Sequence, residues 1–253
     1  MRNRKLFEES VSTAVIRNRT ILSFSVFLVL ISLGIGGWYW LHDQPKKNGA
    51  LLPLRKGLDF NGYVFDNFFS ASRLSSTYPK NAAVPRVRVN GDAGMGDNFD
   101  PFKWKLKLKK QNGEELDISL AEIKSLPKTE VIFDFKCIEG WSQVTHWAGV
   151  KFSDFIKHYK LQDEADMRFT GLITPDSGYY VGIDNKSMLH PQTILCYEMN
   201  GDPLPFNQGA PLRLIIPVKY GIKHIKRIGT IYFQNTRPAD YWYERGYDYY
   251  SGL

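Results

Sequence analysis

The chain of 253 residues contains only two cysteines, Cys137 and Cys196, and this scarcity excludes a disulfide framework. It equally excludes a four-cysteine iron–sulfur cluster within this chain, and no CxxCH haem attachment motif is present. The five histidines lack the spacing that zinc ligands require. Walker, GxGxxG, CxxC, HExxH and GxSxG motifs are also absent. The chemistry of this protein therefore does not rest on any of these common devices.

Charge of one sign is in only mild excess, with a formal net charge of +7 at neutral pH. The basic residues are dispersed along the chain. Such an excess suits an anionic ligand or an anionic membrane surface and does not by itself indicate nucleic acid. We therefore expect no nucleic-acid partner.

Residues 21–41 contain no charged side chain. As a helix this segment is about 31 Å long, which is enough to cross the hydrocarbon core of a bilayer. Trp38, Tyr39 and Trp40 stand at one end, where membrane proteins carry an aromatic belt, and no small-x-small cleavage site follows. The pattern predicts an uncleaved transmembrane anchor between a basic segment, 1–20, and a polar linker, 42–56.

Residues 57–253 are predicted to form one domain of the α+β class, rich in strands and with a few short helices. Strict alternation of polar and apolar residues over 103–109 indicates a half-exposed strand. Further strands are predicted at 130–135, 193–199, 212–218 and 229–234.

Two local signals predict helix starts. Ser119 and Glu122 form a capping box ahead of a short helix, and Ser153 is predicted to cap another. The segments 160–190 and 200–211 are rich in Gly, Pro, Asp and Asn. They are predicted to be long loops, and loops of that length are candidates for a ligand site.

Two stretches are candidates for chemistry. Cys137 directly follows a predicted strand in the run FKCIEGWS, where a thiolate can serve as a soft metal ligand or a nucleophile. Arg213 lies within an apolar strand that leads into a basic run, 219–227. A cation embedded among apolar residues needs an anionic or acceptor partner. The alternatives are an inert core cysteine and a solvated basic loop in which Arg213 pairs with a local carboxylate.

Three separated motifs resemble the molybdopterin-binding domain of sulfite-oxidase-like enzymes. They are FKCIEGWS, then SMLHPQTILCYEMNGDPLPFNQGAPLRLIIPVKYGIKHIKRIGTIYF, then RPADYWYERGYDYY. The similarity is greatest to the bacterial branch that includes the catalytic subunit of the periplasmic methionine-sulfoxide reductase. It is clear over 130–250 and weak over 57–130.

This resemblance implies a sulfite-oxidase-type fold, a molybdenum–molybdopterin cofactor and specific roles for residues. Cys137 matches the cysteine that binds molybdenum, and Arg213 matches an arginine that contacts the pterin. The stretch His224, Ile225 and Lys226 matches the segment around the pterin phosphate. The other positions implied to lie near the cofactor are His190, Asn67 and Gln208, the last standing where the reductase branch has asparagine.

The implied function is two-electron oxo-transfer chemistry on a small substrate by an oxidoreductase. Because the chain has no second redox motif, a haem- or quinone-linked membrane protein is expected as its electron partner. The basic flank and the branch together imply the inner membrane of a bacterium, with the catalytic domain in the periplasm. Exported members carry adjacent arginines, however, whereas Arg17-Asn18-Arg19 is interrupted. Two other functions stay open: a thiol enzyme using Cys137 with His146 or His190, and a non-catalytic accessory subunit of a membrane complex.

Overall fold

The computed structural model describes residues 12–89, 91–96 and 99–252 of the chain, which form two compact units. One unit extends up to Lys46 and includes Leu51–Pro53. The other comprises Lys47–Ala50 and everything from Leu54 onward, and it contains both large sheets and the candidate site.

The first unit is built around α1 (Thr13–His42), a helix of 30 residues. Its N-terminus is capped by the side chain of Ser12, which accepts a hydrogen bond from the backbone of Val15. None of its residues is buried. Within the described part of the chain, α1 is the one helix that is long and apolar enough to cross a membrane. It contains the whole predicted segment 21–41.

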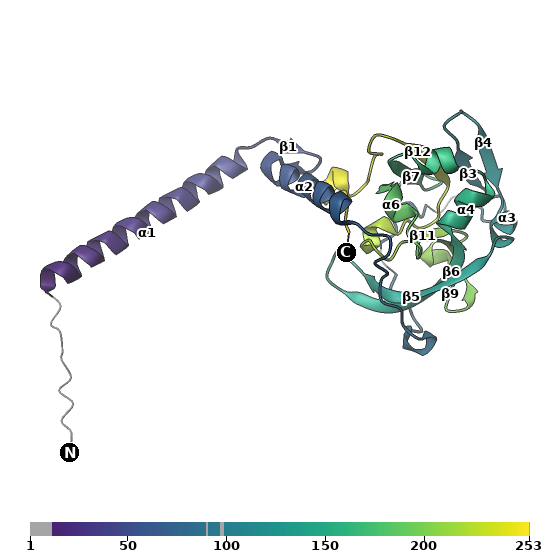
Figure 1. Ribbon diagram of the computed structural model, residues 1–253, viewed down its shortest axis with the longest axis horizontal. Coiled ribbons are helices and arrows are strands. Elements are labelled where there is room, and N and C mark those ends of the chain that lie inside the picture. Colours follow the sequence, from purple (N-terminus) through teal and green to yellow (C-terminus); the bar gives the residue numbers. More distant parts are fainter. Residues whose placement is uncertain (1–11, 90, 97–98, 253) are drawn as a thin grey trace, which may run out of the picture. The chain divides into compact units, whose positions relative to one another are not determined.

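One five-stranded sheet of the second unit is antiparallel throughout. Its strands are β5 (Lys128–Lys136), β6 (Ser142–Lys151), β9 (Ile194–Met199), β10 (Asp202–Pro203) and β11 (Arg213–Ile215). The order is β10-β9-β6-β5, and β11 also pairs with β9. Figure 1 shows β5, β6 and β9 curving together along one side of this unit.

The second five-stranded sheet has the order β4-β3-β12-β7-β8. Its strands are β4 (Glu115–Ile118), β3 (Leu106–Lys109), β12 (Thr230–Gln234), β7 (Phe169–Ile173) and β8 (Tyr180–Asp184). Only the β12–β3 pair is parallel. The prediction of an α+β, strand-rich domain is therefore confirmed.

The helices of the second unit are short, except for α2. They are α2 (Leu52–Phe68, whose first two residues fall in the other unit), α3 (Leu120–Lys124), α4 (Phe152–His158), α5 (Gln162–Ala165) and α6 (Asn185–Met188). The remaining elements are β1 (Lys46–Lys47), β2 (Ala50–Leu51) and the 3-10 turns η1 (Lys80–Ala82), η2 (Phe206–Gln208), η3 (Gly221–Lys223) and η4 (Tyr243–Arg245). Helix α2 thus begins inside the range predicted as a linker, 42–56.

The larger core cluster joins the two sheets. Leu108, Leu172 and Ile231 come from one sheet, and Val150 and Leu195 come from the other, all of them fully enclosed. A second cluster includes Val131, Phe133, Phe135, Trp147 and Cys196. The alternation of buried and exposed residues along β5 is what places the three β5 side chains on one face. Cys196 accordingly lies in a core, as its mid-strand position predicted.

The prediction that 160–190 is a long loop is wrong, because the segment contains α5, β7, β8 and α6. The sequence does not indicate strands here because Gly171 and Gly182 are unfavourable in the interior of a strand. In the sheet the two glycines are partners in register. The rings of Tyr232 and Tyr249 lie where their side chains would project and cover the backbone instead.

Some element boundaries also differ from prediction. Helix α4 begins at Phe152 with Lys151 as its N-cap, so Ser153 lies inside the helix and does not cap it. The capping box of Ser119 and Glu122 is confirmed at α3. Segment 200–211 is mostly irregular, with β10 and η2 within it.

Candidate cofactor site

Cys137 lies in a tight hairpin between β5 and β6. Its backbone N–H donates to the carbonyl of Trp141, and its carbonyl accepts from the N–H of Gly140. Gly140 has a φ of +91°, a conformation that glycine adopts without the steric cost other residues pay. Such three-residue loops with a left-handed third position are common hairpin connections. The turn therefore fixes the thiol at the exact end of the strand ladder, two residues from Glu139.

Cys137 is buried, with 2% of the residue exposed. Burial raises its pKa, and the negative charge of Glu139 adds to this, whereas a hydrogen bond from the Glu139 backbone and the charge of Arg88 oppose it. Arg88 stacks over the ring of Trp141 at 4.8 Å, in the same hairpin. The positive charge of Arg88 favours the thiolate form of Cys137, and the thiolate is the form that binds a metal ion.

Arg213 lies on β11 and is almost completely buried. Its Nη1 donates to the backbone and side-chain oxygens of Gln208, both at 3.0 Å, and its Nη2 donates to the carbonyl of His224. The guanidinium also lies over the ring of Trp147 at 4.6 Å. Among the described residues, its Nε has no hydrogen-bond partner, and no carboxylate forms an ion pair with it. This excludes the alternative in which Arg213 pairs with a local carboxylate of the described chain.

The basic run that follows β11 is folded into the protein and is not a solvated loop. Lys219, Lys223, His224 and Arg227 are each at most 3% exposed. The imidazole of His224 accepts a hydrogen bond at Nδ1 from the backbone of Ile216, so its Nε2 carries the proton and donates to the carbonyl of Lys219.

Burial, followed by the nearby charge of Arg213, lowers the pKa of His224 to about 3. The ring is therefore neutral over the physiological range. Burial and Arg213 also lower the pKa of Lys226 to about 8. Lys226 donates to the carbonyl of Gly91 at 2.8 Å. Burial is the main cause of both shifts, and the positive charge of Arg213 adds to each of them; a bound anion would offset that charge.

These segments surround one pocket of about 440 Å³. Arg213, His224, Gln208 and Lys226 line it, as do Ile138 and Glu139 from the hairpin of Cys137. The rest of the wall is largely aromatic and includes Phe135, Trp141, Trp147, Tyr179, Tyr241 and Trp242. The charged groups Arg88, Asp92 and Glu139 are exposed, whereas Arg213 and His224 are buried. The pocket thus combines an aromatic wall with a buried cation.

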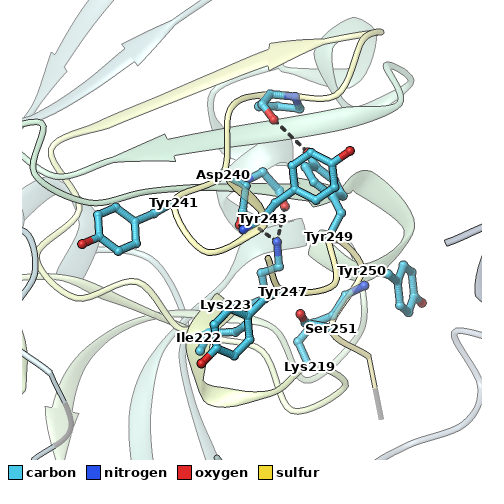
Figure 2. A network of polar contacts seen from close by, with 12 residues as sticks. Lys219, Ile222, Lys223, Asp240, Tyr241, Tyr243, Tyr247, Tyr249, Tyr250 and Ser251 are labelled. Atoms are coloured by element: carbon cyan, nitrogen blue, oxygen red, sulfur yellow. Dashed lines mark hydrogen bonds and ion pairs between the residues drawn. The ribbon is translucent and has the colours of Figure 1, made fainter. Parts of the chain in front are cut away.

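A polar network holds the loop between β11 and β12, part of which lines the pocket (Figure 2). Lys223 forms a buried ion pair with Asp240 and donates to the carbonyl of Gly182 at 3.0 Å. Lys219 pairs with Asp184 at 2.8 Å and lies over the ring of Tyr250. Sequence reasoning identified these lysines only as part of a basic run. Their partners are 17 and 35 residues away along the chain, so no local pattern indicates the pairs.

The structure brings together Arg213, His224, Lys226 and Gln208, with the Cys137 hairpin beside them. Cys137 itself is not among the residues that line the pocket, and neither are the remaining predicted positions. Ile225 is buried in the larger core cluster. The ring of His190 contacts the carbonyl of Arg73 and the backbone of Gln192, and the amide of Asn67 donates within α2 to Tyr63.

A buried guanidinium with an unpartnered Nε, a second cation and a thiol in the hairpin beside the pocket fit an anionic cofactor that takes a soft protein ligand. The large aromatic wall supplies the flat apolar surface that a ring system needs. The residues present therefore fit a phosphate-bearing pterin with a thiolate-bound metal.

Known proteins are similar to this chain in sequence and in fold. The family model "Oxidoreductase molybdopterin binding domain" matches residues 93–242. A protein of Azospira oryzae, named as subunit YedZ1 of a protein-methionine-sulfoxide reductase, is 29% identical over 212 residues, which cover 83% of this chain and 79% of that one. Protein-methionine-sulfoxide reductase catalytic subunits MsrP of Campylobacter jejuni and Xanthomonas campestris are 32% and 33% identical and match 58% of this chain.

The chain spans about half the length of those two MsrP proteins, 54% and 53%. Among solved structures, the sulfane dehydrogenase SoxCD from Paracoccus pantotrophus has a TM-score of 0.50 at 13% identity, over 66% of this chain and 46% of that one. At that identity the likeness shows the fold alone. The family match covers more than half of the chain, including the Cys137 hairpin and the whole basic run. The chain therefore belongs to the family of oxidoreductases built on a molybdopterin-binding domain.

Proposed function

We propose that this protein is a membrane-anchored, molybdenum-dependent oxidoreductase that carries out two-electron oxo transfer on a small substrate. The observation that carries the proposal is the pocket in which Arg213, His224 and Lys226 meet beside the hairpin of Cys137. Each of these residues comes from a motif that resembles the cofactor-binding part of the family.

Cys137 would supply the thiolate ligand of molybdenum, and Arg213 and Lys226 would hold the anionic pterin. When bound, the molybdenum supplies a centre that changes oxidation state by two electrons and exchanges an oxo group with the substrate. Asn67, His190 and Ile225 stay predictions as cofactor contacts, supported by the resemblance alone.

The chain's own residues give that centre its surroundings. Arg213 donates hydrogen bonds to Gln208 and to the carbonyl of His224, so its guanidinium is already in position before a ligand binds. His224 stays neutral and keeps its hydrogen bonds, which leaves the positive charge to Arg213 and Lys226. The aromatic wall excludes water and thereby strengthens the charge-assisted contacts to an anion.

A sulfoxide is the substrate class that we favour, because relatives at 29–33% identity are named as protein-methionine-sulfoxide reductases or subunits of one. The aromatic wall offers contacts to an apolar thioether-type group, and Arg88 at the pocket edge is a donor for a polar oxygen. The electron partner determines whether the substrate is reduced or oxidised.

Helix α1 supports a single-pass anchor, because it is about 45 Å long, its uncharged part 21–41 accounts for about 31 Å, and none of its residues is buried. We place it in the inner membrane of a bacterium with the catalytic domain in the periplasm. Two-electron chemistry at molybdenum needs an electron source or sink, so a haem- or quinone-linked membrane protein is proposed as the partner.

The thiol-enzyme alternative has less support. Burial raises the pKa of Cys137, whereas a nucleophilic cysteine needs a lowered one. His190 is hydrogen-bonded to the backbone of Arg73 and Gln192, whereas His146 has its Nε2 3.7 Å from Glu130, and neither of these contacts brings a ring to the thiol of Cys137. An accessory subunit without catalysis has no need for a buried cation in the pocket and a thiol in the hairpin beside it.

Elemental analysis of the protein extracted from membranes tests the proposal. We expect about one molybdenum per chain together with a pterin, and reduction of a methionine sulfoxide substrate by an artificial electron donor. The matched control is Cys196→Ala, which removes the other buried thiol. A protein that contains no molybdenum, or one in which Cys137→Ala keeps full turnover with molybdenum bound, contradicts the assignment.

A further inference from the structure

Helix α2 is attached to its own unit through polar side chains. Arg55 is buried, and Asp59 forms an ion pair with Arg237 at 3.0 Å. Asp66 forms a second ion pair with Lys186 at 2.8 Å. Phe65 adds one aromatic contact, a stack on Tyr250 at 4.8 Å. Charged groups are therefore the main attachment of this helix to the domain.

The opposite side of α2 exposes aromatic rings. Phe60, Tyr63 and Phe68 are 60%, 66% and 74% exposed, and the rings of Phe60 and Tyr63 stack at 5.9 Å. We call these three residues the aromatic face. A helix that faces water normally buries its apolar stripe, and this helix instead leaves three aromatic side chains exposed on one side. Such an exposed apolar patch indicates that the aromatic face has an apolar partner.

We propose that the aromatic face of α2 lies in the interfacial layer of the lipid bilayer, an inference that rests on the proposed membrane anchor. Helix α1 ends at His42 and α2 begins at Leu52. The nine residues between them make ten Cα–Cα steps, which span at most about 36 Å when fully extended, so the start of α2 stays within that distance of the end of α1.

The composition of α2 and of the residues that precede it suits the interfacial layer. Phenylalanine and tyrosine are characteristic of interfacial helices, with lysines beside them that reach anionic headgroups. Lys56 is exposed one helical turn before Phe60, and Lys47 is exposed just ahead of the helix. Such lysines add electrostatic attraction to an anionic membrane surface.

The contact has a consequence for the catalytic pocket. Arg55 of α2 donates to the backbone carbonyls of Tyr247 at 2.8 Å and Tyr243 at 3.0 Å. Tyr247 also lines the pocket. A helix fixed at the bilayer surface therefore holds the pocket wall at a set orientation to the membrane, where an electron partner must approach it.

Site-directed spin labelling of the full chain tests this inference. Single cysteines replace Val29 in α1, Phe60 in α2 and Asn112 in the turn between β3 and β4, and the protein is reconstituted as one copy per lipid nanodisc. The discs contain only phosphatidylcholine and phosphatidylglycerol. Cys137 and Cys196 are buried, so the label reacts at the introduced position. Power saturation then compares collisions with oxygen, which partitions into lipid, and with a water-soluble nickel chelate.

We expect the label at Phe60 to gain oxygen accessibility and to lose nickel accessibility relative to the label at Asn112. The label at Val29 should be the deepest. If Val29 is accessible to nickel, the anchor itself is wrong. If Val29 is deep but Phe60 behaves like Asn112, the anchor stands and the inference is overturned in favour of a protein partner for this face. Tyr63→Cys provides a second position on the face should Phe60→Cys fold poorly.

Discussion

The buried ion pair of Lys223 and Asp240 offers the sharpest test of how the pocket is supported. Both side chains are at most 2% exposed. Asp240 also accepts hydrogen bonds from the backbone of Gly182 at 3.1 Å and of Tyr243 at 3.0 Å. In Asp240→Asn the new amide keeps one acceptor but turns donors toward Lys223 and Gly182, leaving the buried lysine without its counter-charge.

Removing one partner of a buried pair costs about 3–5 kcal/mol of unfolding free energy. For a unit of this size each kcal/mol corresponds to roughly 2–4 °C in melting temperature, so Asp240→Asn should lower Tm by about 6–20 °C. The matched control is Glu115→Gln, which removes one carboxylate from an exposed pair with Lys107 and Lys109. A surface pair contributes about 1 kcal/mol or less, so that change should stay below about 4 °C.

Calorimetry of both variants provides the measurement, and cofactor content provides a second readout. Lys223 ends the turn η3, whose Gly221 and Ile222 line the pocket, so Asp240→Asn should also lower pterin content whereas Glu115→Gln should not. Adding Lys223→Met to Asp240→Asn removes the stranded charge and should recover part of the lost stability. Equal losses in the two single variants, or a double variant less stable than Asp240→Asn, would refute the reasoning.

Three further predictions concern the pocket. Cys137→Ser should abolish turnover while leaving the circular dichroism spectrum unchanged, and Cys196→Ala should keep activity. Arg213→Ala and Lys226→Ala should each weaken cofactor retention about 10- to 100-fold, because a charge-assisted contact is worth about 1.5–3 kcal/mol; unchanged pterin content in both would be incompatible with their role. The pKa of His224 is about 3 in the folded protein and ordinarily about 6.5, so the unfolded chain binds the proton first. Stability should therefore fall as pH drops from 6.5 toward 3, by up to about 1.4 kcal/mol per pH unit, and denaturant titration of His224→Gln should show a shallower slope over that range.

The predictable part of the fold is the part that local physics decides. The alternation along Val131, Phe133 and Phe135 predicted β5, and the capping box at Ser119 predicted the start of α3. Where tertiary contacts override local preference, prediction failed. Strands β7 and β8 exist because aromatic rings from distant segments cover Gly171 and Gly182, and nothing in the segment itself indicates those rings.

The sequence predicted several residues of the candidate site, but it did not predict what surrounds them. The embedded cation at Arg213 and the thiol after a strand were visible as anomalies in the sequence. The aromatic wall was not, because Trp147 and Tyr179 also satisfy the pattern of ordinary core residues. Burial of Lys219 and Lys223 was equally hidden, since both of their carboxylate partners lie outside the run.

The segment from β11 to the start of β12 contains many cations, and their different surroundings explain why they are tolerated. Lys219 and Lys223 point away from the cofactor pocket and are each neutralised by a carboxylate, Asp184 and Asp240. Arg213 and Lys226 line the pocket, and within the described part of the chain the hydrogen bonds of Arg213 go to neutral oxygens. Neutral acceptors orient a guanidinium without cancelling its charge, so its attraction for an anion is preserved in a region of low dielectric constant. The fold thus compensates the cations that position the loop and leaves the buried Arg213 charge for a ligand, which is the distribution an anionic cofactor requires.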